Sequence, residues 1–540
     1  MLAAERTPMK SARWLVPLLA CAAVLLIAIA GNPRARPSGP EPKILRIAMN
    51  TGDLPTTTGA PTQGLEGMRF AGYPVFEPLV MWDLRVTDRP PGVIPWLATD
   101  WAVDPADHNR WIFHLRRGVT FHDGAPFDAD VVVWNFRRFF DPKAPQYEAS
   151  AAAVAKARAS VLKGWEKIDD HTVAITTTTP TSYFPEILTS VLLVSPARWR
   201  EAGGDWHEFA RRPAGTGAFR VEAVDRTVIR LRRNPHYWNT ARSAKLDGID
   251  LYAMAEPTTR IAALRSGEVD WVENPPADAI PFLKRNGYQV VTSPMPHVWA
   301  YFLRVTPDSP FHDVRVRQAI NYAMDRQGIV TLLNGAAQPA KSFWKPGDVR
   351  YGHPVNDYRY DPATSLRLLR DAGYPHGLPT PVKVLTAPVA SGQMLSLPMN
   401  ELLQQSARKA GFKLEFVVVE GNQMSALYNN PKSPKMAAVY AVNKGYNTGE
   451  MTYLYFWLYP PNLAAYEDPV AKRMMDAYRV NFDPTKETAI LATLHERLVD
   501  DAPMAWVVHD VNPRAFSPNV RGYTPAQSWY TDLTTVDLAR

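Results

Sequence analysis

Few residues in this 540-residue chain stand at spacings that could support catalysis. The sequence has no Gly-x-Ser-x-Gly turn for a nucleophilic serine and no His-Glu-x-x-His motif for a catalytic metal, and its one cysteine is Cys21. Glu66 and Glu450 are isolated carboxylates, and the sequence alone does not exclude their pairing as in a glycosidase. The pattern favours a protein that is not an enzyme, with a hydrolase or glycosidase as the alternative.

Two histidines and two glycines are the remaining candidates for chemistry. His114 and His122 have no second histidine or carboxylate at ligand spacing on one helix face, so we expect structural roles for both. Gly215 and Gly217 lack the following helix and the spacing of a nucleotide-binding loop. The sequence therefore predicts neither a metal site nor a cofactor.

Composition narrows the class of protein further. With 46% hydrophobic and 21% charged residues the chain is typical of a globular protein, and its length is too great for one hydrophobic core. The formal net charge is +7, but the basic residues are mixed with acidic ones and form no block, so no nucleic-acid partner is expected. The 16 Trp and 22 Tyr would suit an aromatic cleft for a small molecule, although most must lie in the core.

The N-terminal residues predict export. Lys10 and Arg13 precede an apolar run from 14 to 30 that ends in small residues, the pattern of a secretory signal peptide over residues 1–30. An uncleaved membrane anchor is the alternative, because the run is near the lower limit for a span. The apolar run continues beyond Cys21, which disfavours a lipoprotein signal. Residues 31–43 are rich in Pro, Arg and Gly and are expected to be a flexible leader.

The rest of the chain alternates between strand and helix patterns. A buried strand at 44–49 leads into a polar loop at 50–67, and hairpins are expected around 101–116 and 218–232. A helix is expected from 127 to 140 with Asp128 as a plausible N-cap. Further helices are expected at 261–266, 314–333, 365–372 and 402–410, with strands at 382–385 and 413–419. This alternation predicts α/β layers with mostly parallel sheet.

Several sequence blocks in a fixed order resemble one known family. The blocks lie at 97–103 (LATDWAV), 113–132 (FHLRRGVTFHDGAPFDADVV), 215–219, 233–238, 311–326 (FHDVRVRQAINYAMDR), 360–363, 371–375, 501–506 and 520–523. Together they are similar to the bacterial extracellular solute-binding proteins of family 5, the peptide, dipeptide, nickel and oligosaccharide receptors of ATP-driven (ABC) importers. The resemblance covers about 44–540. Arg315, Arg317 and Asp325 within it are expected to tie a helix to its surroundings and not to touch ligand.

The resemblance implies a two-lobed α/β periplasmic-binding-protein fold of the large type II variant. Lobe 1 would comprise 44–290, with an extra subdomain at about 70–200, and the C-terminal return 507–540; lobe 2 would comprise 291–506. The two crossing segments, near 290–296 and 506–509, would form the hinge. The protein would be a periplasmic monomer that delivers a small-molecule solute to permease subunits in the inner membrane.

The same resemblance implies a site between the lobes. A ligand that contacts both lobes only when they close shifts the open–closed population, and its polar groups need hydrogen bonds inside. We therefore expect a lining of aromatic, amide, hydroxyl and backbone groups. The candidate residues are Asn50, Thr51, Gly52, Gln63, Glu66, Tyr73, Tyr183, Trp299, Tyr301, Lys444, Tyr446, Asn447, Glu450 and Trp457.

One departure from the family pattern bears on the substrate. Peptide receptors of the family hold the amino terminus of the ligand with an Asp in a Trp-x-x-Asp segment, and the corresponding residues 443–446 have neither the Trp nor the Asp. Glu450 could supply the missing carboxylate. The solute is expected to be oligopeptide-like, or a sugar-containing or modified compound. A sensor or chaperone on the same fold is a further alternative.

Overall fold

The computed structural model describes residues 41–539 except 389–394, 420–422, 425–426, 428–429, 431–432, 437–438 and 460–463. Lys43–Arg540 forms one compact unit. The predicted signal peptide, Cys21 and most of the predicted leader lie outside the described residues. Among the helices that the structure describes, none combines the length and the apolar character that a membrane span requires.

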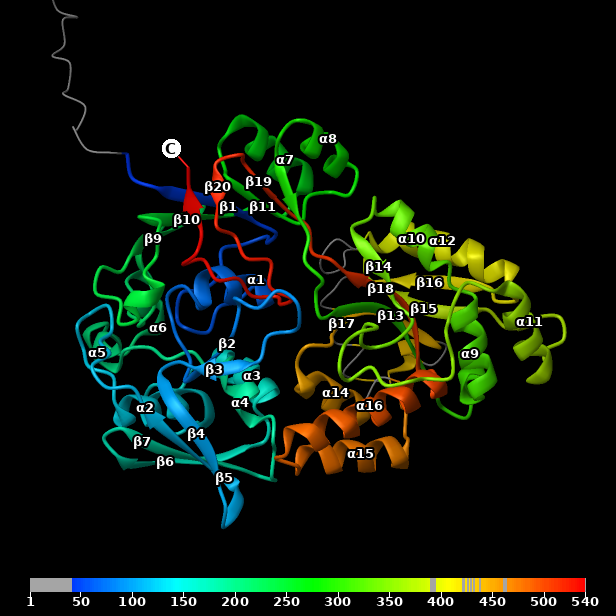
Figure 1. The fold of residues 1–540 in the computed structure, drawn as a ribbon, viewed down its shortest axis with the longest axis horizontal. Coiled ribbons are helices and arrows are strands. Elements are labelled where there is room, and N and C mark those ends of the chain that lie inside the picture. The colour runs from blue at the N-terminus through cyan, green and yellow to red at the C-terminus, as the bar shows by residue number, and fades with distance from the viewer. Residues whose placement is uncertain are drawn as a thin grey trace, which may run out of the picture. The chain divides into compact units, whose positions relative to one another are not determined.

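The first large sheet has seven strands and draws on both ends of the chain (Figure 1). β1 pairs in parallel with β10 and β11, whereas the remaining pairs are antiparallel. In sheet order the strands are β12 (Gln289–Val291), β19 (Arg514–Phe516), β11 (Trp271–Glu273), β1 (Ile44–Met49), β10 (Gly248–Ala253), β9 (Val228–Arg233) and β8 (Phe219–Val224). The predicted first strand and the 218–232 hairpin are therefore confirmed.

The second large sheet has six strands; β15 pairs in parallel with β16 and β17, and the other described pairs are antiparallel. In sheet order they are β14 (Ala337–Pro339), β18 (Met504–Asp510), β13 (His297–Leu303), β17 (Ala441–Asn447), β15 (Val382–Thr386) and β16 (Leu414–Val418). The prediction of mostly parallel sheet was wrong for both sheets. One reason is that the chain enters this sheet on β13 and leaves on β18, so these two central strands run in opposite directions.

Two segments connect the large sheets. The chain passes from β12 to β13 through residues 292–296 and returns from β18 to β19 through residues 511–513. These segments lie side by side, since the N–H groups of Ser293 and Met295 donate to the carbonyls of Val511 and Asp510. The return therefore falls just after the segment 506–509 that the sequence suggested, because those residues continue β18.

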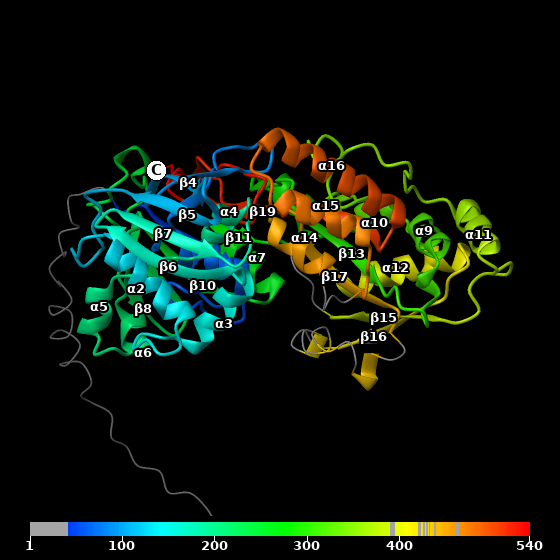
Figure 2. The same ribbon diagram turned by 90° about the horizontal axis from the view of Figure 1, so that it is seen from below.

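Helices cover both faces of each large sheet, which confirms the α/β fold class. In the second sheet, Trp299 and Tyr301 on one face of β13 pack in a cluster that includes Met399, while Val298 and Phe302 on the other face belong to a separate cluster. This alternation follows from the two-residue period of a strand. Figures 1 and 2 show α9 (Val314–Tyr322) and α12 (Ser396–Lys409) next to this sheet. They also show α15 (Pro469–Arg479) and α16 (Pro484–Asp501) beside it.

The helices and the short strands complete the described structure. The α-helices are α1 (Gly64–Gly67), α2 (Ala129–Phe140), α3 (Ala149–Arg158), α4 (Phe184–Leu188), α5 (Pro196–Glu201), α6 (Trp206–Arg211), α7 (Pro257–Ser266), α8 (Ala279–Arg285), α9 (Val314–Tyr322), α10 (Arg326–Leu332), α11 (Pro362–Asp371), α12 (Ser396–Lys409), α14 (Met451–Leu458), α15 (Pro469–Arg479) and α16 (Pro484–Asp501). The other helical turns are η1 (Met68–Gly72), η2 (Thr240–Arg242), η3 (Pro310–His312) and η4 (Pro434–Met436). Further strands are β2 (Val80–Trp82), β3 (Val93–Pro95), β4 (Ala98–Asp104), β5 (Asp107–Leu115), β6 (Leu162–Asp169), β7 (Thr172–Thr177), β20 (Val520–Arg521) and β21 (Asp537–Leu538).

The helices that the sequence predicted are confirmed, with one exception. Asp128 caps α2 as predicted, its carboxylate accepting from the N–H of Val131 at 3.0 Å. The single helix expected over 314–333 is instead two helices, because Asp325 accepts from the N–H of Gly328 and starts α10 afresh. The expected tie by Arg317 is confirmed, since its guanidinium contacts the side chain and the carbonyl of Asp501 at 2.7 and 2.8 Å.

A buried carboxylate explains two of the family blocks as structural. Glu77 is 1% exposed and accepts four hydrogen bonds, each of 2.7 Å. The donors are Trp96, Thr216, Tyr237 and Trp238. Since a buried carboxylate without partners is costly, these donors are what makes its burial tolerable. The blocks at 215–219 and 233–238 thus hold lobe 1 together.

Candidate functional site

Residues from both lobes line one narrow pocket. From lobe 2 come Asn447, at the end of β17, with Gly449 and Glu450 just before α14. From lobe 1 come Trp82 at the end of β2 and the segment 527–530, which we call the C-terminal loop. The enclosed space is only about 20 Å³, so the walls approach closely here. A side chain at Gly449 would place its Cβ 2.9 Å from Pro296, which explains the glycine.

Glu450 is the acidic group of this pocket. Its Oε1 accepts from the side-chain amide of Asn447 at 3.0 Å. Burial raises the pKa of Glu450 above its ordinary value, while the attraction of Arg158 and the hydrogen bond from Asn447 oppose that shift. Glu450 is therefore a desolvated carboxylate held in place from one side.

Arg158 is the basic group whose charge acts on Glu450, and it belongs to lobe 1 at the end of α3. Burial alone would lower the pKa of Arg158, but the attraction of Tyr530, Glu450 and nearby tyrosines outweighs burial and holds it above the ordinary value. No salt bridge within 4.0 Å joins Arg158 and Glu450, both of which the structure describes. The two lobes thus present opposite charges that attract each other without closing into a contact pair.

Aromatic side chains surround this charged pair. Tyr73 lies edge-to-face with Tyr530 at a ring distance of 4.8 Å, and its hydroxyl donates to the carbonyl of Thr189 at 3.0 Å. Tyr453 from α14 is a further neighbour that acts electrostatically on both Arg158 and Glu450. Tyrosines here supply apolar ring faces together with hydroxyls, which suits a small polar solute.

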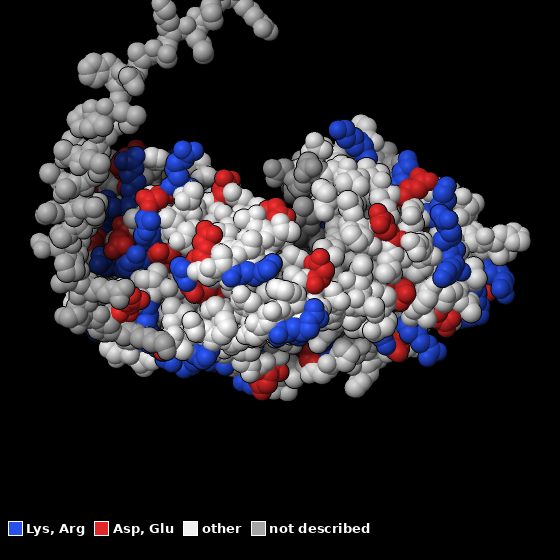
Figure 3. All heavy atoms as spheres, turned by 90° about the horizontal axis from the view of Figure 1, so that it is seen from above, with Lys and Arg blue, Asp and Glu red and all other residues white. Residues whose placement is uncertain are grey.

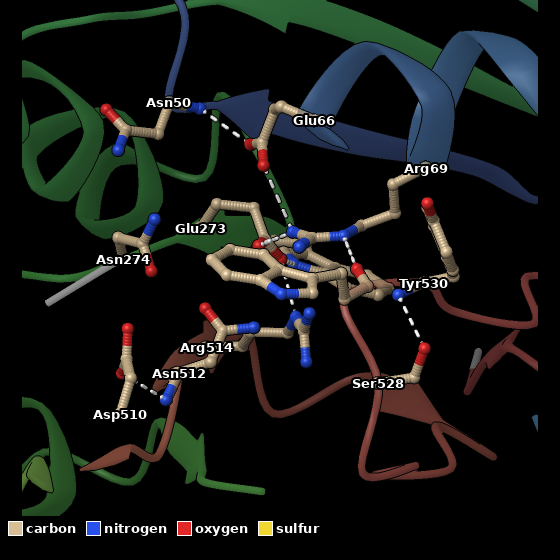
Figure 4. Close-up of polar contacts among 12 residues, drawn as sticks. Asn50, Glu66, Arg69, Glu273, Asn274, Asp510, Asn512, Arg514, Ser528 and Tyr530 are labelled. Carbon is tan, nitrogen blue, oxygen red and sulfur yellow. Dashed lines mark hydrogen bonds and ion pairs between the residues drawn. The ribbon is translucent and has the colours of Figure 1, made fainter. Parts of the chain in front are cut away.

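A buried ionic network contacts the C-terminal loop through Arg69 (Figure 4). Glu273, at the end of β11, is fully buried; its Oε1 accepts from Trp271 and from the Nε of Arg514, each at 2.7 Å, and its Oε2 pairs with Arg69. Burial alone would raise the pKa of Glu273, but Arg514 and Arg69 hold it below the ordinary value. Arg514 begins β19 immediately after the return crossing, so this carboxylate anchors the hinge to lobe 1.

Arg69 links Glu273 to the C-terminal loop, which forms one wall of the pocket. Its Nε donates to the carbonyl of Trp529 at 2.5 Å, and its Nη1 pairs with Glu66 at 3.0 Å. Glu66 in turn accepts from the N–H of Asn50 at 2.9 Å, and the side-chain oxygen of Asn50 accepts from Arg260 at 3.1 Å. Asn50 and Glu66, two predicted ligand contacts, therefore have partners within the protein.

The structure brings together only part of the predicted set. Asn447 and Glu450 line the pocket between the lobes, Tyr73 packs against Tyr530 of its wall, and Gln63 lines a second cavity within lobe 1. Thr51 is buried with no hydrogen-bond partner for its hydroxyl, whereas Gly52 and Lys444 are exposed.

The remaining predicted aromatics pack against other protein groups. Trp299 and Tyr301 are fully buried in the core of lobe 2, where the hydroxyl of Tyr301 donates to Asn400 at 2.5 Å. Tyr446 packs on three aromatic rings, and Trp457 stacks on Tyr466 at 5.2 Å. We leave Trp299 and Tyr301 out of the site that we propose.

Tyr183 lies where the lobes touch each other. Its ring stacks on Tyr478 of α15 at 5.8 Å, and the neighbouring Ser182 donates from its N–H to the carbonyl of Arg479 at 2.8 Å. The adjacent Glu186 is also enclosed by lobe 2, since it accepts from the N–H of Met451 and interacts with Arg350. Lobe-to-lobe contact is therefore made by residues 182–186 as well as by the pocket.

Sequence reasoning missed Arg158, Tyr453 and the C-terminal loop. Arg158 ends an alanine-rich helix that carries no motif, and the loop begins 70 residues after Trp457, the nearest predicted contact. Their proximity to the site depends on contacts between segments that are distant in sequence, and no local pattern indicates such contacts.

The two histidines have the structural roles that were expected. His122 accepts from the N–H of Gly215 at 3.2 Å and hydrogen-bonds the carbonyl of Gly217 at 3.0 Å, and burial lowers its pKa to about 4. His114 is exposed and contacts Asp100. Within the described residues, no group of three or more His, Cys, Asp or Glu side chains could hold a metal ion. Basic and acidic residues are interspersed over the face in Figure 3, with no large patch of one sign.

The architecture and the site between the lobes define a two-lobed solute-binding protein. Residues 92–465 match the family described as bacterial extracellular solute-binding proteins, family 5, and the chain belongs to that family. Its members bind small solutes in the periplasm and deliver them to the permeases of ABC importers.

Similar proteins show the range of the family. Heme-binding protein A of Haemophilus influenzae is 29% identical over 67% of this chain and 68% of its own length. The glutathione-binding protein GsiB of Pectobacterium atrosepticum is 27% identical over 76% of this chain and 79% of its own length. Among solved structures, HbpA2 of Haemophilus parasuis superposes with a TM-score of 0.79 at 22% identity, covering 92% of this chain and all of that one. DppA of Helicobacter pylori in complex with the peptide STSA superposes with a TM-score of 0.74 at 22% identity, covering 92% and 98%.

The enclosure of Glu186 predicts a specific pH dependence of stability. Burial raises the pKa of Glu186 from 4.5 to about 7, against the opposing attraction of Arg350. Between these values the unfolded chain ionises while the folded protein keeps the proton, so this group lowers stability as pH rises from 4.5 to 7. We expect Glu186→Gln to gain stability over the wild type across that interval, as measured by urea unfolding at a series of pH values.

The exposed Glu208→Gln serves as the matched control and should parallel the wild type. A Glu186→Gln curve that runs parallel to the wild type from pH 4.5 to 8 would show that Glu186 is solvated.

Proposed function

We propose that this chain is the receptor of an ABC importer for a small zwitterionic, peptide-like solute. The observation that carries the proposal is the desolvated pair at the pocket between the lobes, with Glu450 on lobe 2 and Arg158 on lobe 1. A solute with an ammonium and a carboxylate would satisfy both groups at once. Each charge would then exchange water for a compensating partner, which is the condition for burying it.

The pair also supports a mechanism for closure. Since Glu450 and Arg158 belong to different lobes, a zwitterion contacts both only when the lobes are together. Binding energy that exists only in the closed state is what shifts the population toward that state. The permease would then recognise the closed conformation, which is populated mainly when the solute is bound.

Glu450 supports a peptide-like solute despite the missing Trp-x-x-Asp segment. Glu450 is the N-cap residue of α14, four residues after Tyr446, and the side-chain amide of Asn447 donates to its carboxylate. Among similar proteins, GsiB is named for glutathione, and the DppA structure holds the peptide STSA. We therefore include conjugates of small peptides, such as S-substituted glutathiones, in the same proposal.

Removing either charge should weaken binding of such a solute. We expect Glu450→Gln to reduce the affinity for triglycine and S-methylglutathione by about 10- to 100-fold, since a buried charge-assisted hydrogen bond contributes about 1.5–3 kcal/mol. N-acetylation of either probe should reduce wild-type affinity similarly and should cost the Glu450→Gln variant little more. Isothermal titration calorimetry measures these constants.

Glu467→Gln, an exposed position in the same lobe, is the control and should bind as the wild type does. Equal affinity of the wild type for free and acetylated probes, or binding of neither free probe at millimolar concentration, would contradict the proposal.

We also propose that the chain is exported and cleaved after Ala30. The basic start, apolar run and small residues before Gly31 support this. Mass spectrometry of the periplasmic protein should give a chain that begins at Gly31. A chain that retains the apolar run would favour a membrane anchor instead.

A further inference from the structure

A second cavity is lined by residues of lobe 1 alone, and Arg158 is one of them. It has a volume of about 270 Å³ and lies between the loop that precedes α1 and the helix α3. Its walls come from Thr56 and 59–64, from Met68 of η1 and Phe139 of α2, from 190–191, and from Glu148, Ser150, Ala151, Val154, Ala155 and Arg158 in and just before α3. We call it the α3 cavity.

The α3 cavity is mostly apolar. Met68, Phe139 and Val191 form its buried parts, and α3 contributes the small side chains of Ala151 and Ala155. The small size of these alanines is what leaves the space open. Val154 also lines the cavity and is 55% exposed, so it contributes apolar surface that a ligand could cover.

Arg158 joins the α3 cavity to the proposed site. It lines the cavity, and the same guanidinium interacts electrostatically with Tyr530, Glu450 and Tyr73 at the pocket between the lobes. Ala151, Ala155 and Arg158 are spaced four and three residues apart, so they share one face of α3. An anion held by Arg158 would therefore lie directly beside the apolar wall.

We infer that the α3 cavity receives an apolar arm of the solute, such as an aromatic or branched aliphatic side chain, next to an acidic group held by Arg158. This inference rests on the proposed function and narrows the solute to amphiphilic acids, such as hydrophobic peptides or acyl and aryl conjugates of amino acids. The volume is of the order that one large side chain occupies, and one charge beside an apolar wall matches the usual anatomy of small-molecule sites.

An anionic aromatic dye tests the cavity without knowledge of the natural solute. The probe is 1-anilinonaphthalene-8-sulfonate, whose rings suit the apolar wall and whose sulfonate suits Arg158. We expect saturable one-to-one binding to the native protein with increased fluorescence. Ala155→Trp, which fills the cavity, should weaken binding at least 10-fold, and Arg158→Gln should weaken it several-fold.

Two further variants protect the test against misfolding. Ala153→Trp places the same side chain on the exposed part of α3 outside the cavity and should bind the dye as the wild type does. Val154→Asp, at an exposed position, should also weaken dye binding, because it puts a charge in the apolar wall. Near-ultraviolet circular dichroism of each variant should match the wild type.

The outcomes separate this inference from the proposed function. Glu450→Gln should weaken the binding of triglycine without weakening that of the dye, because Glu450 attracts Arg158 and does not hold the sulfonate. Ala155→Trp should weaken the binding of the dye more than that of triglycine, which has no side chain to fill the cavity. If the wild type shows no saturable binding of the dye, or if Ala155→Trp binds it as tightly as Ala153→Trp does, the inference is overturned even where triglycine binds.

Discussion

The buried carboxylate of Glu273 is the interaction on which the geometry of lobe 1 depends. It is fully buried and shared by Arg69 and Arg514, which come from opposite ends of the chain. Breaking such a pair by removing one partner typically costs about 3–5 kcal/mol, because the remaining charge is left buried. Arg69, which pairs with this carboxylate, also donates to the carbonyl of Trp529 and so positions the C-terminal loop. Arg514, its other partner, positions the first residue of β19, where the chain re-enters lobe 1.

Under our proposal, this arrangement would give the molecule a fixed base beside the joint between the lobes. Within the described residues, 292–296 and 511–513 are the segments that connect the two large sheets, and the network lies on the lobe 1 side of the second one. A ligand that draws Glu450 toward Arg158 therefore moves lobe 2 against a fixed wall. Rigid walls matter because binding energy is then used for closure and not for ordering the site.

Sequence patterns predicted the fold class and several local elements, but neither the pairing within the sheets nor all the residues of the proposed site. The Asp128 cap, the strand at 44–49 and the hairpins follow from local rules, and the ordered blocks gave the family. The direction of pairing in the sheets was missed, because it depends on how distant strands meet. Trp299 and Tyr301 illustrate a second limit, since an alternating aromatic strand has the same pattern whether its faces meet helices or a cleft. Arg158 was missed because nothing near it in sequence signals its partner on lobe 2.

The central claim is that one zwitterion holds Glu450 and Arg158 together across the joint. It is tested most directly by the distance between the lobes, measured by double electron–electron resonance between non-reducible spin labels at Asp107→Cys and Val355→Cys, both exposed. With S-methylglutathione the account predicts a shorter and narrower distance distribution, and no change with the N-acetylated analogue. An unchanged distribution while S-methylglutathione is bound would contradict the account.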